Sequence, residues 1–188
     1  MNRLAQLVKR FIEIDFQYMQ TSLPFMQKVM DIISTDVRLI INHVIQPKKF
    51  HPVQFGNTKI FYDTKYATKT LLTTVYDFYV ETRLASILPK NPVVLDIGAN
   101  IGQFVVAVKS FYPRAKIYSY EPDKDVFLLL KDNASQFHNT YVFNYGLSDK
   151  NRKAIFYRSN NFSEWSSLKP MEGYEYTKTE ADLKKGDD

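Results

Sequence analysis

Two acidic residues and a glycine-rich turn have the types and spacing to bind a nucleotide-like ligand. Asp96 and Glu121 each end a stretch of strand-like residues, and Gly98 and Gly102 follow shortly after Asp96. Gly98 would let the chain turn tightly, and Gly102 would let a ligand or an adjacent strand approach the backbone. A carboxylate at the position of Glu121 can accept hydrogen bonds from both hydroxyls of a ribose. Free amides at the start of the helix expected after Gly102 add positive potential.

The glycine spacing separates two candidate ligands. A dinucleotide loop has the pattern G-x-G-x-x-G, whose central glycine admits a pyrophosphate. Here Asn100 stands between Gly98 and Gly102, and the carboxylate of Asp96 precedes them. That carboxylate would repel a diphosphate but not a ligand with ammonium and sulfonium charges. The loop therefore favours S-adenosylmethionine over NAD, although Glu121 alone would serve either ligand, and Asp96 or Glu121 could instead cap a helix.

Alternating apolar patterns indicate the elements that would position these residues. Continuous apolar or alternating runs predict strands over residues 93–97, 116–120, 140–143 and 154–157, and helical spacing predicts helices over 102–111 and 126–134. Strands separated by short helices are typical of βαβ units in a parallel sheet. The sequence therefore predicts an α/β, Rossmann-like, mostly parallel sheet with flanking helices, and ligands of such sheets bind beyond the carboxyl ends of the strands.

The rest of the chain divides into three further parts. Residues 1–50 are predicted to be an N-terminal helical region of two amphipathic helices, one up to about Gln20 and one from Ser22 to Pro47. The second has the stripe Phe25, Val29, Ile32, Ile33, Val37, Ile40 and Val44. Such stripes are normally core, so packing on the domain or between the two helices is favoured over a partner or membrane-surface role.

The domain itself is expected to span residues 51–168, with a hairpin over 53–62 around Gly56-Asn57 and a helix from Ala67 to Leu88 before the first parallel strand. Residues 169–188 are rich in charge and have no apolar period, so a loop or frayed charged tail is expected there.

Three motifs resemble the FkbM family of methyltransferases. They are the runs Leu95–Phe104, Tyr120–Asp123 and Phe143–Asp149, within a similarity that covers roughly residues 76–168. The resemblance implies an S-adenosylmethionine-dependent enzyme that methylates a hydroxyl of a sugar or other small metabolite. It also implies a cofactor site in which Asp96, Gly98, Asn100 and Gly102 surround the methionine moiety, Glu121 binds the ribose, and Asn144 and Tyr145 lie at the adenine edge.

The family continues beyond these motifs in a way this chain does not. A Leu-Asp pair, a Lys-Ile-Asp-x-Glu-Gly segment and three more strands are expected after the third motif and are absent. The resemblance therefore implies the first half of the enzyme, truncated at the C-terminus. Two alternatives stay open, namely an NAD-dependent oxidoreductase and a truncated, non-catalytic cofactor-binding module.

Composition excludes several classes of function. The chain has no cysteine, which rules out disulfides, thiolate metal sites and a cysteine nucleophile. The net charge of +5 is spread without long basic runs, so no nucleic-acid partner is expected. Lys9, Arg10, Glu13 and Asp15 interrupt the apolar N-terminus, which argues against a signal peptide or membrane span and favours the cytoplasm.

No residue stands out as a catalytic base. Asp149 follows the third motif, but an aspartate that caps a turn is the favoured interpretation. His138 is expected to be exposed, and His43 and His51 have no metal-binding pattern. Trp165 could line a substrate entrance or anchor its loop. The resemblance offers Glu81 as the counterpart of an acid that the family often has upstream, but a helix-surface glutamate is the favoured interpretation. A small hydroxylated substrate is expected, with no metal.

Overall fold

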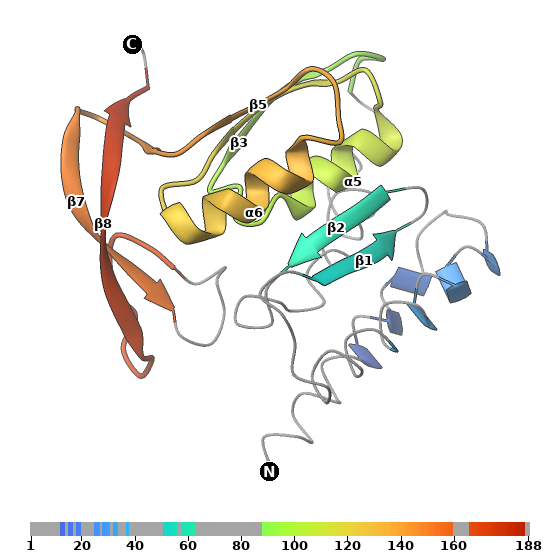
Figure 1. Ribbon diagram of the computed structural model, residues 1–188, viewed down its shortest axis with the longest axis horizontal. Helices are drawn as coiled ribbons and strands as arrows, with labels where there is room; N and C mark the ends of the chain where they lie inside the picture. Colours follow the sequence, from blue (N-terminus) through green and yellow to red (C-terminus); the bar gives the residue numbers. More distant parts are fainter. Residues whose placement is uncertain are drawn as a thin grey trace.

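The computed structural model describes residues 51–55, 58–62, 88–159 and 166–186, together with individual positions between 12 and 37 (Figure 1). Its parallel sheet consists of β3 (Val93–Ile97), β4 (Lys116–Tyr120) and β5 (Thr140–Phe143), in that spatial order. The helices α5 (Gln103–Phe111) and α6 (Lys124–Ala134) connect them. The predicted strands over 93–97, 116–120 and 140–143 are thereby confirmed, and so is the α/β class.

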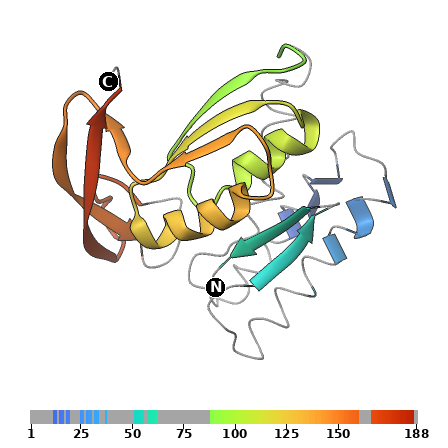
Figure 2. The same ribbon diagram turned by 45° about the horizontal axis from the view of Figure 1, so that its top comes forward.

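Both connecting helices lie on one face of this sheet (Figures 1 and 2). Two successive right-handed crossovers in the same direction place their helices on the same side. One buried cluster includes Val105, Val108 and Leu130 of the helices and Ile117 of β4. The helix α5 is also covered on a second side, where Val106 and Ala107 belong to another buried cluster that includes Ile60 of the hairpin strand Thr58–Tyr62. The glycine turn before α5 is therefore anchored between two layers of core.

The opposite face of the parallel sheet carries exposed apolar side chains. Val93, Leu95 and Ile97 are 69%, 63% and 64% exposed. The register continues this face across the sheet, where the ring centroids of Tyr118 and Tyr141 stack 5.2 Å apart. Parallel sheets are normally covered on both faces, so this side of the sheet is unusually open.

A β-hairpin covers the helices on the side away from the sheet (Figures 1 and 2). Strands β1 (His51–Phe55) and β2 (Thr58–Tyr62) pair antiparallel, which confirms the hairpin predicted around Gly56-Asn57. The fully buried Asn133 of α6 fastens the hairpin, because its Oδ1 accepts from Phe61 N at 2.6 Å and its Nδ2 donates to Phe61 O at 2.8 Å. The same Nδ2 donates to Ile101 O at 2.6 Å, which ties the glycine turn to α6 and β2.

A second sheet follows, in the order β6-β8-β7, beside the amino-terminal end of α6 (Figure 1). It is formed by β6 (Gly146–Ser148), β7 (Arg152–Ser159) and β8 (Tyr176–Lys185). The strand predicted over 154–157 exists and is longer, but it pairs antiparallel with β8 outside the parallel sheet.

The prediction of a loop or frayed tail over residues 169–188 is wrong for residues 176–185. In β8 the inward residues Thr179, Ala181 and Leu183 alternate with charged residues such as Lys178 and Asp182, and Ala181 and Leu183 are buried. This is a period of two, and hydrogen bonds to both β6 and β7 hold the strand in place.

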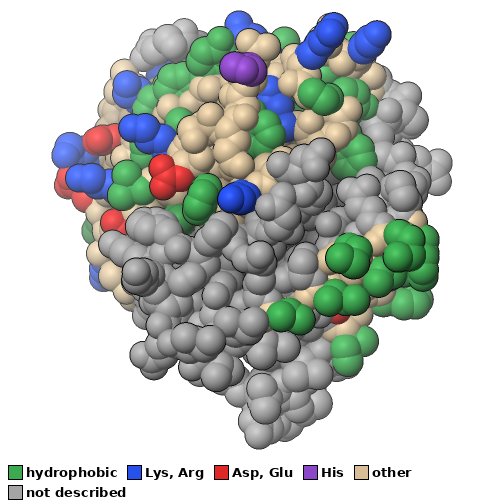
Figure 3. All heavy atoms as spheres, turned by 45° about the vertical axis from the view of Figure 1, so that its right-hand side comes forward, with side chains coloured by type: hydrophobic (Ala, Val, Ile, Leu, Met, Phe, Trp, Pro, Cys, Tyr) green, Lys and Arg blue, Asp and Glu red, His purple; other side chains and the backbone are tan. Residues whose placement is uncertain are grey.

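The described N-terminal positions are helical and face two ways. Tyr18 is fully buried in the cluster that contains Ile60, and Ile32 packs against it, so the predicted packing is confirmed for Ile32. The predicted packing is wrong for Phe25, Ile33 and Val37 of the same stripe, because these side chains are exposed. They belong to an exposed apolar surface (Figure 3). That surface comprises Ile12, Phe16, Phe25, Met26, Met30, Ile33 and Val37.

Two other expectations concern little of the described structure. The helix predicted from residue 67 lies outside the described residues except for Leu88, which is in a bend. No helix among the described residues is long and apolar enough to cross a membrane.

Candidate functional site

The turn between β3 and α5 is held in an unusual backbone conformation. Gly98, Asn100 and Gly102 have φ angles of 79°, 51° and 88°, in the left-handed region that favours glycine and tolerates asparagine. The amides of Gly98 and Ala99 both donate to Tyr120 O, at 2.9 and 3.0 Å. The turn is therefore fixed against the carboxyl end of β4, as expected for a ligand site of a parallel sheet.

The two glycines of the turn have different surroundings. A Cβ at Gly98 would meet nothing within 4 Å, so this position borders open space. A Cβ at Gly102 would lie 3.0 Å from Leu130 Cδ1 and 3.6 Å from Asn133 Cβ. The close neighbour of Gly102 is thus α6 rather than an adjacent strand, while the expected approach of a ligand stays a prediction.

Asp96 lies at the end of β3 with only 8% of the residue exposed. Its side chain is on the face of the sheet that the helices cover, where its Oδ2 accepts from Ser119 Oγ at 3.1 Å. Burial raises the pKa of Asp96 to about 6, although the hydrogen bond from Ser119 lowers it. With a pKa of about 6, the carboxyl of Asp96 is still mostly ionised at neutral pH, so it could compensate a nearby cation.

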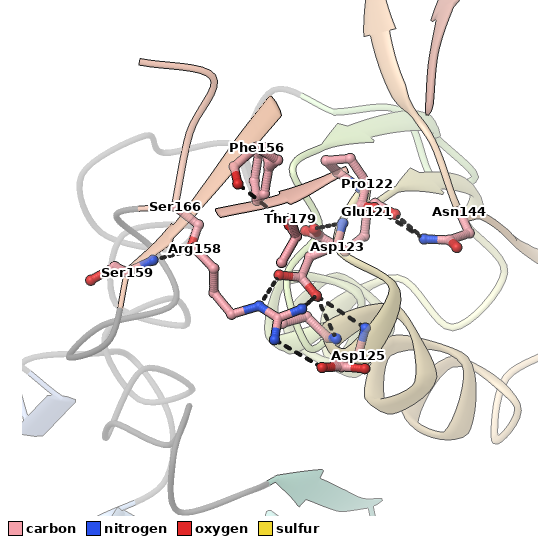
Figure 4. Close-up of polar contacts among 11 residues, drawn as sticks. Glu121, Pro122, Asp123, Asp125, Asn144, Phe156, Arg158, Ser159, Ser166 and Thr179 are labelled. Carbon is pink, nitrogen blue, oxygen red and sulfur yellow. Dashed lines mark hydrogen bonds and ion pairs between the residues drawn. The ribbon is translucent and has the colours of Figure 1, made fainter. Parts of the chain in front are cut away.

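Glu121 follows β4 and is 6% exposed. Its Oε2 accepts from Asn100 N at 2.9 Å. Its Oε1 accepts from Asp123 N at 2.8 Å (Figure 4). Burial raises the pKa of Glu121 to about 7, against the lowering effect of these two amides. Each carboxylate oxygen retains capacity for a further donor, so hydroxyls of a ligand could still bind.

Neither of the two acids caps a helix. The N-cap of α6 is Asp123, whose Oδ1 accepts from Asp125 N at 3.0 Å and Val126 N at 3.4 Å. The N-cap of α5 is Gly102, which has no side chain to serve as a cap. The helix-cap alternative for Asp96 and Glu121 is therefore wrong, and both carboxylates remain candidates for ligand binding.

Asn144 and Tyr145 lie beside the same acidic segment. The Nδ2 of Asn144 donates to Glu121 O at 2.9 Å and to Pro122 O at 3.4 Å (Figure 4). The ring of Tyr145 lies 5.5 Å from that of Tyr120, measured between centroids. The structure brings both residues to the end of β4, while their predicted contact with an adenine stays a prediction.

Gln103 is a residue of the site that sequence reasoning missed. It is the first residue of α5 and is 9% exposed, and its Oε1 is buried without a hydrogen-bond partner in the described part of the chain. Buried acceptors of this kind are normally paired, so a donor on a ligand beside the glycine turn would satisfy it. An ammonium group fits that requirement.

The weaker candidates lie apart from these residues or outside the described structure. Asp149 is exposed in a bend and accepts from Ser148 Oγ at 2.9 Å, a hydrogen bond that lowers the pKa of Asp149, while its turn-capping role stays a prediction. His138 is exposed, as expected. Within the described residues, no group of three or more His, Cys, Asp or Glu side chains is arranged to hold a metal ion. Outside the described residues lie His43, Glu81, Trp165 and the side chain of His51.

Comparisons with known proteins relate part of the chain to methyltransferases. The 2-O-methyltransferase NoeI of Sinorhizobium fredii is 30% identical over 90 residues, which are 46% of this chain and 37% of that protein. The AMB antimetabolite synthetase AmbE of Pseudomonas aeruginosa is 36% identical over 90 residues, 47% of this chain and 4% of that protein. The chain thus spans well under half the length of these relatives. No family model matches it.

A solved methyltransferase, FkbM from Methylobacillus flagellatus, is also similar in structure. Its sequence identity is 13%, the TM-score is 0.34, and the match covers 64% of this chain and 34% of that chain.

Proposed function

We propose that the chain binds S-adenosylmethionine at the glycine turn and takes part in transferring its methyl group to a hydroxyl of a sugar or other small molecule. One observation carries the proposal. Two buried carboxylates, Asp96 and Glu121, flank a turn whose Gly98 borders open space. The 30% identity to a protein named 2-O-methyltransferase supports the hydroxyl as acceptor.

The charges and hydrogen-bonding groups of the site suit this cofactor. The ammonium and sulfonium groups outweigh the single carboxylate of S-adenosylmethionine, and Asp96 would compensate the excess. Gln103 Oε1 supplies a buried acceptor that has no partner among the described residues, and an ammonium would occupy it. Glu121 would accept hydrogen bonds from the ribose hydroxyls, with Asn100 N–H holding its Oε2 in place.

When bound, S-adenosylmethionine would supply a methyl group on a positively charged sulfur; as the acceptor oxygen bonds to the methyl carbon, the carbon–sulfur bond breaks, S-adenosylhomocysteine leaves as a neutral thioether, and the hydroxyl proton passes to solvent. The described residues of this chain contribute binding and orientation, which are the main requirements of an in-line methyl transfer. Asp96 would hold the methionine part of the cofactor and Glu121 its ribose, and the turn at Gly98 borders the open space beside them. Asn144 and Tyr145 would border the adenine.

Isothermal titration calorimetry with S-adenosylmethionine and with NADH tests the proposal. S-adenosylmethionine should bind and NADH should not. Asp96→Asn and Glu121→Gln should each weaken binding by at least about tenfold, because each removes a charged acceptor. The control Glu172→Gln changes the same charge in an exposed turn and should bind as the wild type does.

The pH dependence gives an independent check. The free carboxyls of Asp96 and Glu121 have pKa values of about 6 and about 7, so below neutral pH each must lose a proton before it can act as a charged partner of the ammonium or of the ribose hydroxyls. Affinity should therefore rise from pH 5.5 to pH 8 and then level off. Absence of wild-type binding at every pH from 5.5 to 8, or binding by both variants as tight as that of the wild type, refutes the proposed site.

A further inference from the structure

An arginine of the second sheet reaches the amino end of α6. Arg158 of β7 donates through Nε and Nη2 to both carboxylate oxygens of Asp123, the latter at 2.5 Å to Oδ1 (Figure 4). Its Nη1 donates to Asp125 Oδ2 at 2.8 Å. The side chains of Arg158 and Asp123 are 8% and 1% exposed, so this two-pronged ion pair is shielded from water. Such a pair has a fixed geometry, because the planar guanidinium matches the carboxylate.

Asp123 also contacts the proposed ribose-binding acid. While its carboxylate binds Arg158, its backbone N–H donates to Glu121 Oε1 at 2.8 Å. The other oxygen of Glu121 accepts from Asn100 N in the glycine turn. A continuous chain of hydrogen bonds therefore runs from β7 through Asp123 and Glu121 to the turn that follows β3.

The second sheet also packs on the segment between Glu121 and Asp123. A Cβ at Gly146 of β6 would lie 2.8 Å from Leu183 Cδ2 of β8 and 3.5 Å from Pro122 Cβ, so these elements approach closely. Asn144 holds the carbonyls of Glu121 and Pro122 from the same side. Packing and Asn144 restrain the backbone of this segment, whereas Arg158 contacts its acidic side chain from β7.

We infer that Arg158 is a positioning residue for the cofactor. By fixing Asp123 in two directions, it orients the Asp123 N–H and thereby the Glu121 carboxylate toward the ribose hydroxyls. This inference rests on the proposed function, since it assigns a role within the same site. It gives the second sheet a part in ligand recognition although no residue of β7 needs to touch the ligand.

A ribose-dependent binding measurement separates this role from a purely structural one. S-adenosylhomocysteine and its 2′-deoxy analogue are titrated into the wild type and into Arg158→Met. The wild type should bind S-adenosylhomocysteine (the ribose form) more tightly than the analogue, because Glu121 accepts a hydrogen bond from the 2′-hydroxyl that the analogue lacks. Arg158→Met should reduce that preference by about tenfold, the loss expected for one misaligned hydrogen bond to a charged group.

Two further variants keep the test decisive. Lys153→Met removes the exposed ion pair to Glu180 from the same strand and should retain the full preference. Arg158→Lys keeps the positive charge but cannot bridge both oxygens of Asp123, so its preference should also fall. Arg158→Lys decides the matter if Arg158→Met does not fold.

The possible failures are distinguishable. If the wild type binds neither ligand, the proposed function fails, and the inference fails with it. If the wild type prefers the ribose form and the folded Arg158 variants keep that preference, the inference alone is wrong. Equal weakening of both ligands in the Arg158 variants would likewise overturn it, since Arg158 would then only support the fold.

Discussion

Without ligand, Glu121→Gln should gain stability relative to the wild type as the pH rises from 5 to 8. Burial raises the pKa of Glu121 from 4.5 to about 7, so the folded protein must ionise an unfavourable group above neutral pH. A carboxyl with a raised folded pKa loses stability as pH rises from its unfolded pKa to its folded pKa. At 1.36 kcal/mol per unit, the loss is about 3 kcal/mol at pH 8 and about 1 kcal/mol at pH 5.

Glutamine does not titrate, so the variant escapes this loss. It also leaves one of the two amides, from Asn100 or Asp123, without an acceptor, which costs about 1–3 kcal/mol at every pH. That cost cancels when two pH values are compared. The difference in the free energy of unfolding between variant and wild type should therefore shift by about 2–3 kcal/mol toward the variant from pH 5 to pH 8.

Urea unfolding of both proteins at pH 5, 6, 7 and 8, without ligand, measures this shift. Glu172→Gln, in an exposed turn, should show a difference from wild type that hardly changes with pH. A difference between Glu121→Gln and wild type that is constant from pH 5 to pH 8 would refute the reasoning, because Glu121 would then ionise as easily in the folded protein as in the unfolded chain.

Two predictions concern the packing that supports the turn, and urea unfolding measures both. Asn133→Ala should destabilise the protein by about 3–5 kcal/mol, since it leaves backbone groups of Phe61 and Ile101 without partners. The neighbouring exposed Asp132→Ala is its control, and an equal effect of both changes would contradict the prediction. Gly102→Ala should cost about 1–3 kcal/mol from a left-handed backbone and from crowding against Leu130. Gly173→Ala has a similar φ of 84° and an open environment, so it should cost less, and an equal loss would show that the crowding is relieved.

The sequence predicted the parts of the fold whose apolar pattern is strong. The strands around Asp96 and Glu121 and the hairpin before them agree with the structure because short apolar or alternating runs between turn signals mark them clearly, even though one face of β3 is exposed. The strand β8 was missed because its inward face has only one large apolar residue, Leu183, beside Thr179 and Ala181, which carry little apolar signal. Its period of two was nevertheless present in the sequence.

Within the site, the positions of Asp96 and Glu121 followed from the glycine turn and from the ends of predicted strands. Asp123 also had a sequence signal, since an aspartate before an apolar helical run is a typical N-cap. The partnership of Arg158 with Asp123 had none, because the two residues come together only when the second sheet folds against α6. Contacts between distant segments of this kind depend on the tertiary arrangement.

The open apolar face of the parallel sheet has a practical consequence for every unfolding measurement on this protein. Val93, Leu95 and Ile97 offer the native state the kind of surface to which fluorogenic hydrophobic dyes bind. Such a dye would fluoresce before any heating, and its signal would report on this face as well as on unfolding. Circular dichroism avoids the interference, whereas intrinsic tyrosine emission would also report on this face, because Tyr118 and Tyr141 stack there.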